Sequence, residues 1–265
     1  YKQAITSMSL SVDGLISQYF SDHTRDALSD NHSEALNYYI DKSEGWKTLA
    51  DHTDYNSLGH SKQDILFIEA IFNRLDPLVD LDFQRKSTYD GTDLDIYSVD
   101  YVSTWREGAV GQVFDQYSSG AWWDVVWKDT DGIAELNDFD RNTIIHEIGH
   151  ALGLSHPFED PTNGNWNTDD TVMSYNRSID GWDYWFSAND IAALQAIWGV
   201  ENDQQSSSNQ SSHPTMIQFT EEASNMLAMQ NSSRDHRFTD SQFDYLAIIN
   251  NQDRSECSSH LLHNH

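Results

Sequence analysis

Three histidines and a glutamate near the middle of the 265-residue chain have the spacing of a metal site. His146 and His150 are four positions apart, so on a helix both imidazoles project from one face and can share a metal ion. Glu147 lies beside that face, within reach of a water molecule on the metal. The segment 140–153 is therefore predicted to be a helix that carries two metal ligands and a general base.

The residues that follow this helix supply a third candidate ligand. Gly153 allows the chain to leave the helix with a positive φ, and His156 can then return as a third nitrogen ligand. Three protein ligands and one open position for water are what a catalytic zinc ion requires. The spacing predicts one zinc ion bound by His146, His150 and His156, with Glu147 as the general base.

Two other interpretations of these residues stay open at this point. The segment could be an amphipathic helix with incidental histidines, because Ile148, Ala151 and Leu152 already supply apolar side chains. Alternatively, a glutamate further along the chain could complete a zinc site in place of His156. Replacing His156 by glutamine discriminates the second alternative, because zinc would then stay bound.

The elements that must position these residues mix helices and strands. Helices are predicted over 61–77 and 187–199, and each begins with a serine followed three residues later by an aspartate, the pattern of a capping box. Apolar periodicity predicts strands over 79–83, 94–102, 109–114 and 122–127. Such interspersed elements predict an α+β fold in which helices pack on a mixed β-sheet.

The composition excludes several classes of function. The chain has 43 Asp and Glu against 15 Lys and Arg, a formal net charge of −28. We therefore expect no binding to nucleic acid or to an anionic membrane, since both require clustered cations. No apolar stretch approaches the length of about 18 residues that a membrane span needs, and the first twenty residues contain no signal-peptide core. The single cysteine, Cys257, excludes an internal disulfide.

The character of the chain changes near Asp203. All 13 glycines and all nine tryptophans lie at or before Gly199, and the segment 204–212 consists only of Gln, Ser and Asn. We therefore predict a catalytic domain over 1–203, followed over 204–265 by a polar linker and a poorly structured C-terminal tail.

A second motif lies downstream of the histidines, in the segment Thr171-Val172-Met173-Ser174-Tyr175-Asn176. Together with the extended histidine motif it resembles the metzincin zinc metallopeptidases, in which a tight Met-turn places a methionine beneath the zinc. The resemblance implies a zincin/metzincin-type catalytic domain. Such a domain has a twisted mixed β-sheet with packed helices, an active-site helix, a Met-turn and a small C-terminal subdomain.

Within the metzincins the chain resembles the serralysin/matrixin group. The Met-Ser-Tyr form of the turn is similar to that of serralysins and astacins, in which the tyrosine is an additional, displaceable zinc ligand, and Tyr175 matches that position. The segment 190–199 resembles the C-terminal helix of serralysin and matrixin domains, and astacins would be expected to carry disulfides. Serralysins usually continue into glycine-rich calcium-binding repeats, which the glycine-free segment 204–265 cannot form.

The resemblance implies a secreted zinc endopeptidase that acts on a protein or peptide substrate, with Tyr175 hydrogen-bonding the oxyanion. We expect a monomer, and either the strand over 109–114 or that over 122–127 could pair with an extended peptide. The alternative outside enzymes is a non-catalytic adhesion or extracellular-matrix module of metzincin fold, stabilised by its metal. Proteolysis assays with a Glu147 variant as control distinguish the two.

An acidic segment between 129 and 140 offers a second metal site as an open alternative. Its carboxylates suit calcium, which prefers oxygen ligands; they belong to Asp129, Asp131, Glu135, Asp138 and Asp140. The competing interpretation is a solvated acidic loop, because aspartates are abundant throughout the chain.

Overall fold

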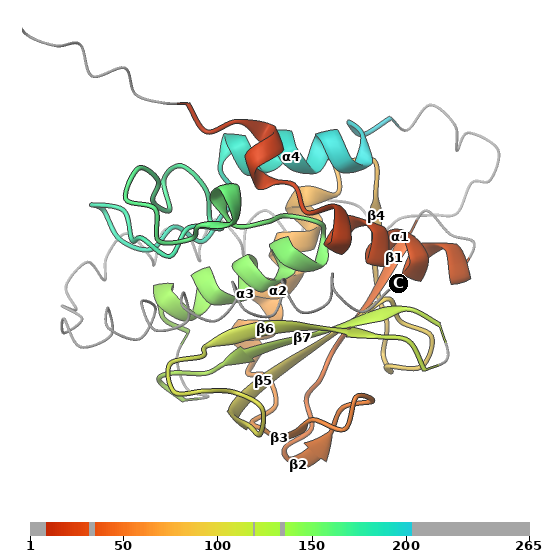
Figure 1. Ribbon diagram of the computed structural model, residues 1–265. Coiled ribbons are helices and arrows are strands. Elements are labelled where there is room, and N and C mark those ends of the chain that lie inside the picture. Colours follow the sequence, from red (N-terminus) through yellow and green to blue (C-terminus); the bar gives the residue numbers. More distant parts are fainter. Residues whose placement is uncertain (1–8, 32–34, 119, 133–135, 203–265) are drawn as a thin grey trace, which may run out of the picture.

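The computed structural model describes residues 9–31, 35–118, 120–132 and 136–202 (Figure 1). The predicted domain boundary at Asp203, the segment 204–265 and Glu135 lie outside these residues. Over the described ranges, no helix combines the length and the apolar character that crossing a membrane requires.

The described chain forms a seven-stranded mixed sheet. Its strands are β1 (Ala35–Ile40), β2 (Gly45–Thr48), β3 (Asp54–Ser57), β4 (Asp82–Arg85), β5 (Leu94–Val102), β6 (Gly111–Gln116) and β7 (Trp122–Lys128). Strands β4, β1, β5 and β7 run parallel to their neighbours in that order. The other three pair antiparallel: β3 with β5, β2 with β3, and β6 with β7. Strand β6 therefore forms one edge of the sheet.

Helices cover one face of this sheet, as Figure 1 shows. They are α1 (Gln18–Asn31), α2 (Lys62–Leu75), α3 (Asp138–Ala151) and α4 (Ala188–Trp198), with short 3₁₀ turns η1 (Val12–Leu15) and η2 (Pro157–Glu159). Leu36, Ile96 and Val125 from neighbouring strands belong to one buried apolar cluster with Ile144 and Ile148 of α3. The predicted α+β class with a mixed sheet and packed helices is confirmed.

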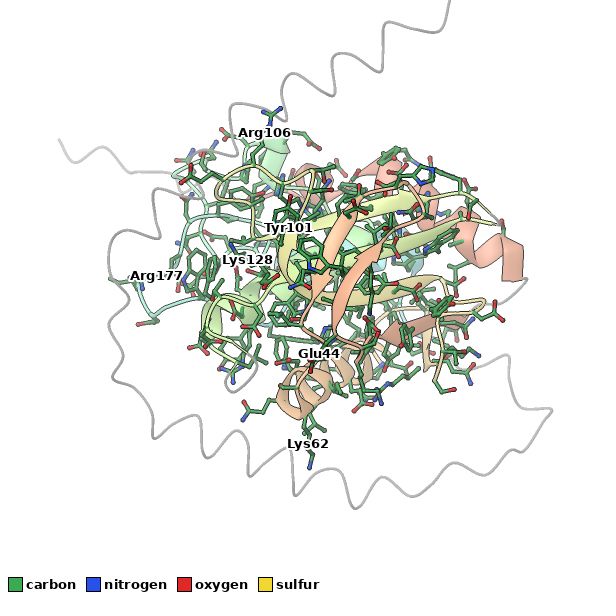
Figure 2. All side chains as sticks on the ribbon, turned by 90° about the horizontal axis from the view of Figure 1, so that it is seen from below. Glu44, Lys62, Tyr101, Arg106, Lys128 and Arg177 are labelled. Carbon is green, nitrogen blue, oxygen red and sulfur yellow. The ribbon has the colours of Figure 1, made fainter. Side chains whose placement is uncertain are left out.

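The opposite face of the sheet has a smaller core of its own. Figure 2 views this side, where β2 and β3 lie and where Tyr101 is labelled. Tyr55 of β3 packs there with Val99 and Val126 from β5 and β7. Helix α3 packs instead on the larger core, on the opposite face of the sheet. Its histidine motif therefore lies on the side of the sheet that the helices cover.

The two predicted capping boxes form as expected. Ser61 and Asp64 exchange both capping hydrogen bonds at the start of α2, and Ser187 and Asp190 do so at the start of α4. These motifs are local, which is why the sequence reveals them.

The strand predicted over 79–83 begins later than expected. The backbone N–H groups of Leu78 and Val79 both donate to the carbonyl of Leu75, so the chain turns after α2 before it extends. Pairing starts only at Asp82, opposite Ala35 of β1. The apolar side chains of Val79 and Leu81 are buried in this turn rather than in a strand.

Candidate metal centre and active site

Helix α3 carries the histidine motif through the interior of the protein. The Asn137 side chain caps its first turn by accepting a hydrogen bond from the Asp140 N–H. The helix therefore starts at Asp138, two residues before the predicted start. It ends at Ala151, with Leu152 as the C-cap residue, and Gly153 follows with the predicted positive φ, 103°. Every residue from 142 to 151 is buried, so α3 is not an amphipathic surface helix.

The three candidate ligands converge on one point. The Nε2 atom of His156 lies 3.3 Å from Nε2 of His146 and 3.3 Å from Nε2 of His150. His146 and His150 are buried and His156 is partly buried. Within the described chain, these three histidines form the group around this point, with no carboxylate among its members. The structure thus brings His156, rather than a downstream glutamate, to the pair on α3.

Two backbone carbonyls fix the tautomers of the helix histidines. Nδ1 of His146 lies 2.8 Å from the carbonyl oxygen of Val172, and Nδ1 of His150 lies 2.8 Å from that of Leu154. A carbonyl can only accept, so each Nδ1 carries the proton and donates it. Each Nε2 therefore presents a lone pair towards the centre of the group, the form in which histidine binds a metal.

The spacing of these nitrogens fits a zinc ion. Two imidazoles bound to one tetrahedral zinc at about 2.0–2.1 Å have their Nε2 atoms about 3.3–3.4 Å apart. The observed separation from His156 to each neighbour is 3.3 Å. A proton on His156 Nε2 could serve only one of the two facing lone pairs, whereas a cation satisfies all three. The triad can bind a metal ion, and its geometry is consistent with zinc.

Burial also keeps these imidazoles neutral. Desolvation lowers the pKa of His146 to about 4. Desolvation, reinforced by the neighbouring histidines, lowers the pKa of His150 to about 3 and that of His156 well below its usual value. Because metal ligation requires the neutral ring, protons compete weakly for this site at neutral pH.

Glu147 lies next to the triad at the wall of a small pocket. The pocket lies between α3, the start of β6 and the loop after the histidines. Its lining comprises Val110, Gly111, Phe139, Asn142, Thr143, His146, Glu147, Ser174, Tyr175 and Trp182. Only Glu147, His146 and Tyr175 of this set are identifiable from sequence as site residues. Val110, Gly111 and Trp182 come from segments whose approach depends on the tertiary fold, whereas the remaining four residues lie on α3 or in the turn at Met173.

The predicted turn at Met173 passes directly beneath α3. The Ser174 N–H donates to the carbonyl of Thr171, closing a tight turn. The Met173 side chain is fully buried, and a Cβ atom on Gly149 would lie 2.8 Å from its Sδ atom. Glycine at position 149 therefore lets the helix and the methionine side chain approach closely, and a larger residue would force the Met173 side chain to shift. The same segment supplies the Val172 carbonyl that binds His146.

Tyr175 follows this turn and lies against the triad. Its ring centroid is 5.5 Å from that of His146 and 5.0 Å from that of His156. Its backbone N–H donates to the carbonyl of Pro161, which holds the backbone from which the Tyr175 side chain projects. The structure thus places the Tyr175 ring beside two of the imidazoles that the resemblance to serralysins predicts it to join at the metal.

Asp190 links α4 to the segment that binds His146. Its carboxylate is fully buried and accepts hydrogen bonds from the Thr171 hydroxyl at 2.5 Å, the Val172 N–H at 3.0 Å and the Ser187 N–H at 2.8 Å. Its role as a capping residue is visible in the sequence. Its hydrogen bond with Val172, whose carbonyl accepts from His146, cannot be seen in the sequence, because it depends on how α4 packs.

We expect Asp190→Ala to destabilise the fold and to weaken metal binding. The substitution leaves three donors without their charged acceptor, which should lower the free energy of unfolding by about 3 kcal/mol. Loss of support for the Val172 carbonyl should weaken zinc affinity roughly tenfold. Thermal unfolding and zinc competition measure both effects, with the exposed Asp180→Ala as a control. Unchanged values in both assays would show that Asp190 supports neither the fold nor the triad.

The acidic segment brings three of its five carboxylates together. Asp129, Asp131 and Asp140 place oxygens within 4.8 Å of one another. Asp140 accepts from the backbone N–H and hydroxyl of Thr130, and burial raises its pKa to about 7. Asp138 instead pairs with Arg141. Hydrogen-bond donors within the loop thus satisfy some of its carboxylate oxygens. Calcium binding at this position stays a prediction.

A buried group of three neutral imidazoles, with a carboxylate and a pocket beside it, is the arrangement that catalytic zinc sites use. Sequence comparison points to metallopeptidases of one kind. Over 101 residues the chain is 34% identical to Serralysin G of Dickeya chrysanthemi. It is 31% identical over 94 residues to the metallopeptidase AprA of Pseudomonas marginalis, and 40% identical over 88 residues to a serralysin of Photorhabdus laumondii. The predicted resemblance to serralysins is confirmed as partial homology.

The homology covers part of each protein. The matched segments make up 32%, 25% and 26% of this chain and 21%, 18% and 18% of the three relatives. No family model matches the chain. Among solved structures, the GM1-bound form of the ECX AB5 holotoxin aligns over 72% of this chain and 86% of that chain. Its TM-score of 0.37 and 12% identity are too low to support an argument about the fold.

Proposed function

We propose that this chain is a metzincin-type zinc endopeptidase that hydrolyses protein or peptide substrates outside the cell. The observation that carries the proposal is the convergence of the Nε2 atoms of His146, His150 and His156, with separations of 3.3 Å. The partial homology to serralysins supports the same reaction class. Secretion is proposed from that resemblance.

A bound zinc ion supplies two things at such a site: it lowers the pKa of water to about 7 and it polarises a carbonyl group. His146, His150 and His156 hold the ion through Nε2. The carboxylate of Glu147, in the adjoining pocket, accepts a proton from the attacking water and passes it to the leaving amine. The Tyr175 hydroxyl donates a hydrogen bond to the carbonyl oxygen as negative charge develops on it.

The sheet favours one of the two strands considered for substrate pairing. Strand β7 is paired on both sides, with β5 and with β6, so the prediction that it could receive a peptide is wrong. Within the described chain, β6 pairs only with β7 and has a free edge. An extended peptide paired with β6 would pass the pocket at Gly111 and Glu147.

We expect Tyr175→Phe to slow hydrolysis and leave the metal bound. The three histidines remain, so the variant should retain one zinc per chain, while loss of a donor to the oxyanion should lower kcat by roughly 10²-fold. Steady-state kinetics and metal analysis on the same preparation measure both quantities. A Tyr175→Phe enzyme with unaltered kcat would remove Tyr175 from the mechanism.

The proposed function itself is tested by metal removal. The zinc-loaded chain should cut an unfolded generic protein at internal bonds, a chelator should stop the cleavage, and added zinc should restore it. If the chain binds zinc but never cleaves, the alternative of a non-catalytic adhesion or matrix module is favoured instead. Cleavage that continues in the chelator would exclude a metallopeptidase.

A further inference from the structure

Gly111 lies where an edge strand of the sheet passes close to the active-site helix. It is the first residue of β6, the edge strand next to α3, and pairs with Trp127 of β7. Side chains alternate between the two faces of a strand. The next residue on the same face, Val113, packs into the core beneath the helices. Gly111 thus faces α3, at a position where a side chain would normally fill space.

The space at Gly111 is occupied by Glu147. A Cβ atom built on Gly111 would lie 2.7 Å from both Cγ and Cδ of Glu147 and would also collide with Oε1. These three atoms are its nearest neighbours within 4 Å, and all belong to one side chain. The φ of Gly111 is not in the left-handed region, so the backbone conformation itself does not require glycine. The absence of a side chain is what this position provides.

We infer that Gly111 is a positioning residue that sets the conformation of the Glu147 carboxylate. The inference rests on the proposed function, in which Glu147 is the general base. Helix α3 is buried from residue 142 to residue 151 and cannot shift readily there. A methyl group at position 111 would therefore rotate the flexible Glu147 side chain away from β6, leaving the backbone in place. Displacement of about 1 Å can cost a catalytic group roughly 10²-fold in rate.

The structure offers a matched control for this substitution. Gly164 also has a φ outside the left-handed region, is exposed, and would place a Cβ more than 4 Å from other atoms. Gly164→Ala should therefore leave turnover unchanged. Gly111→Ala should retain one zinc per chain and an unchanged KM but lose roughly 10²-fold in kcat. If Gly111→Ala matches Gly164→Ala in kcat, the inference is overturned.

A second readout does not depend on activity. Gly111→Ala should lower the Tm, by roughly 2–4 °C, when Glu147 is present. In a Glu147→Ala background the clash disappears, so the same change should be neutral or raise the Tm, because alanine is favoured over glycine within a strand. Such non-additivity shows that Gly111 acts through Glu147. An equal loss in both backgrounds would contradict the inference. A wild-type chain without peptidase activity would contradict the proposed function. The Tm comparison in the two backgrounds would still show whether Gly111 acts on the Glu147 side chain.

Discussion

Glu147→Ala is expected to abolish peptide hydrolysis while one zinc per chain stays bound. The variant keeps all three histidines, and the Nδ1–H groups of His146 and His150 still donate to the carbonyls of Val172 and Leu154. It loses the carboxylate that we propose takes the proton from the attacking water. General acid–base catalysis contributes roughly 10²–10⁴-fold, and kcat/KM should fall by that factor at least.

The control for this variant is Glu107→Ala, which removes an exposed glutamate from a loop. It should keep wild-type turnover, so that a loss in Glu147→Ala is not a general effect of removing negative charge. Zinc is measured by elemental analysis on the assayed samples. Near wild-type turnover in Glu147→Ala would disprove its assignment as the base. Loss of zinc would show instead that Glu147 holds the metal.

His150→Ala is expected to remove both the zinc and the activity. His150 is one of the three proposed ligands, and the centroid of its imidazole ring lies 5.0 Å from that of the Phe20 ring in α1. Losing the metal removes the stabilisation that a bound ligand gives to the folded state. The variant should therefore unfold at a lower temperature, and its Tm should no longer respond to added zinc.

His52→Asn is the matched control for this variant. His52 is exposed and has a positive φ of 71°, a conformation that asparagine tolerates. It should keep zinc, activity and Tm. Stoichiometric zinc in His150→Ala would contradict the assigned site. Stoichiometric zinc in His156→Gln would revive the hypothesis that another residue provides the third ligand.

The parts of the fold that could be predicted are those specified locally. The α3 motif, both capping boxes and the positive φ at Gly153 depend on residues within a few positions of one another. Helix α1 was not predicted because its buried side includes polar residues. Among them, Thr24 donates to the carbonyl of Ala151 and accepts from the indole of Trp123. These partners are distant in sequence, so the residues of α1 do not show the usual apolar pattern.

The candidate site divides in the same way. The identity of the ligands follows from their spacing, whereas the groups that orient them come from other segments. The Val172 carbonyl accepts the hydrogen bond of His146, while the Val172 N–H donates to Asp190 of α4, a residue distant in sequence. Gly111 meets Glu147 only because β6 forms the edge of the sheet beside α3. Strands β2 and β3 were also missed, since each is four residues long and rich in polar side chains.

The most direct test of the proposed zinc peptidase function is a titration of zinc into the metal-free protein while peptide cleavage is followed. We predict that turnover rises in proportion to bound zinc and reaches its maximum at one ion per chain, because one group of three histidines in the described part of the chain is proposed to hold the catalytic metal. Binding that saturates at one ion without any turnover, or cleavage by the metal-free chain, would contradict it.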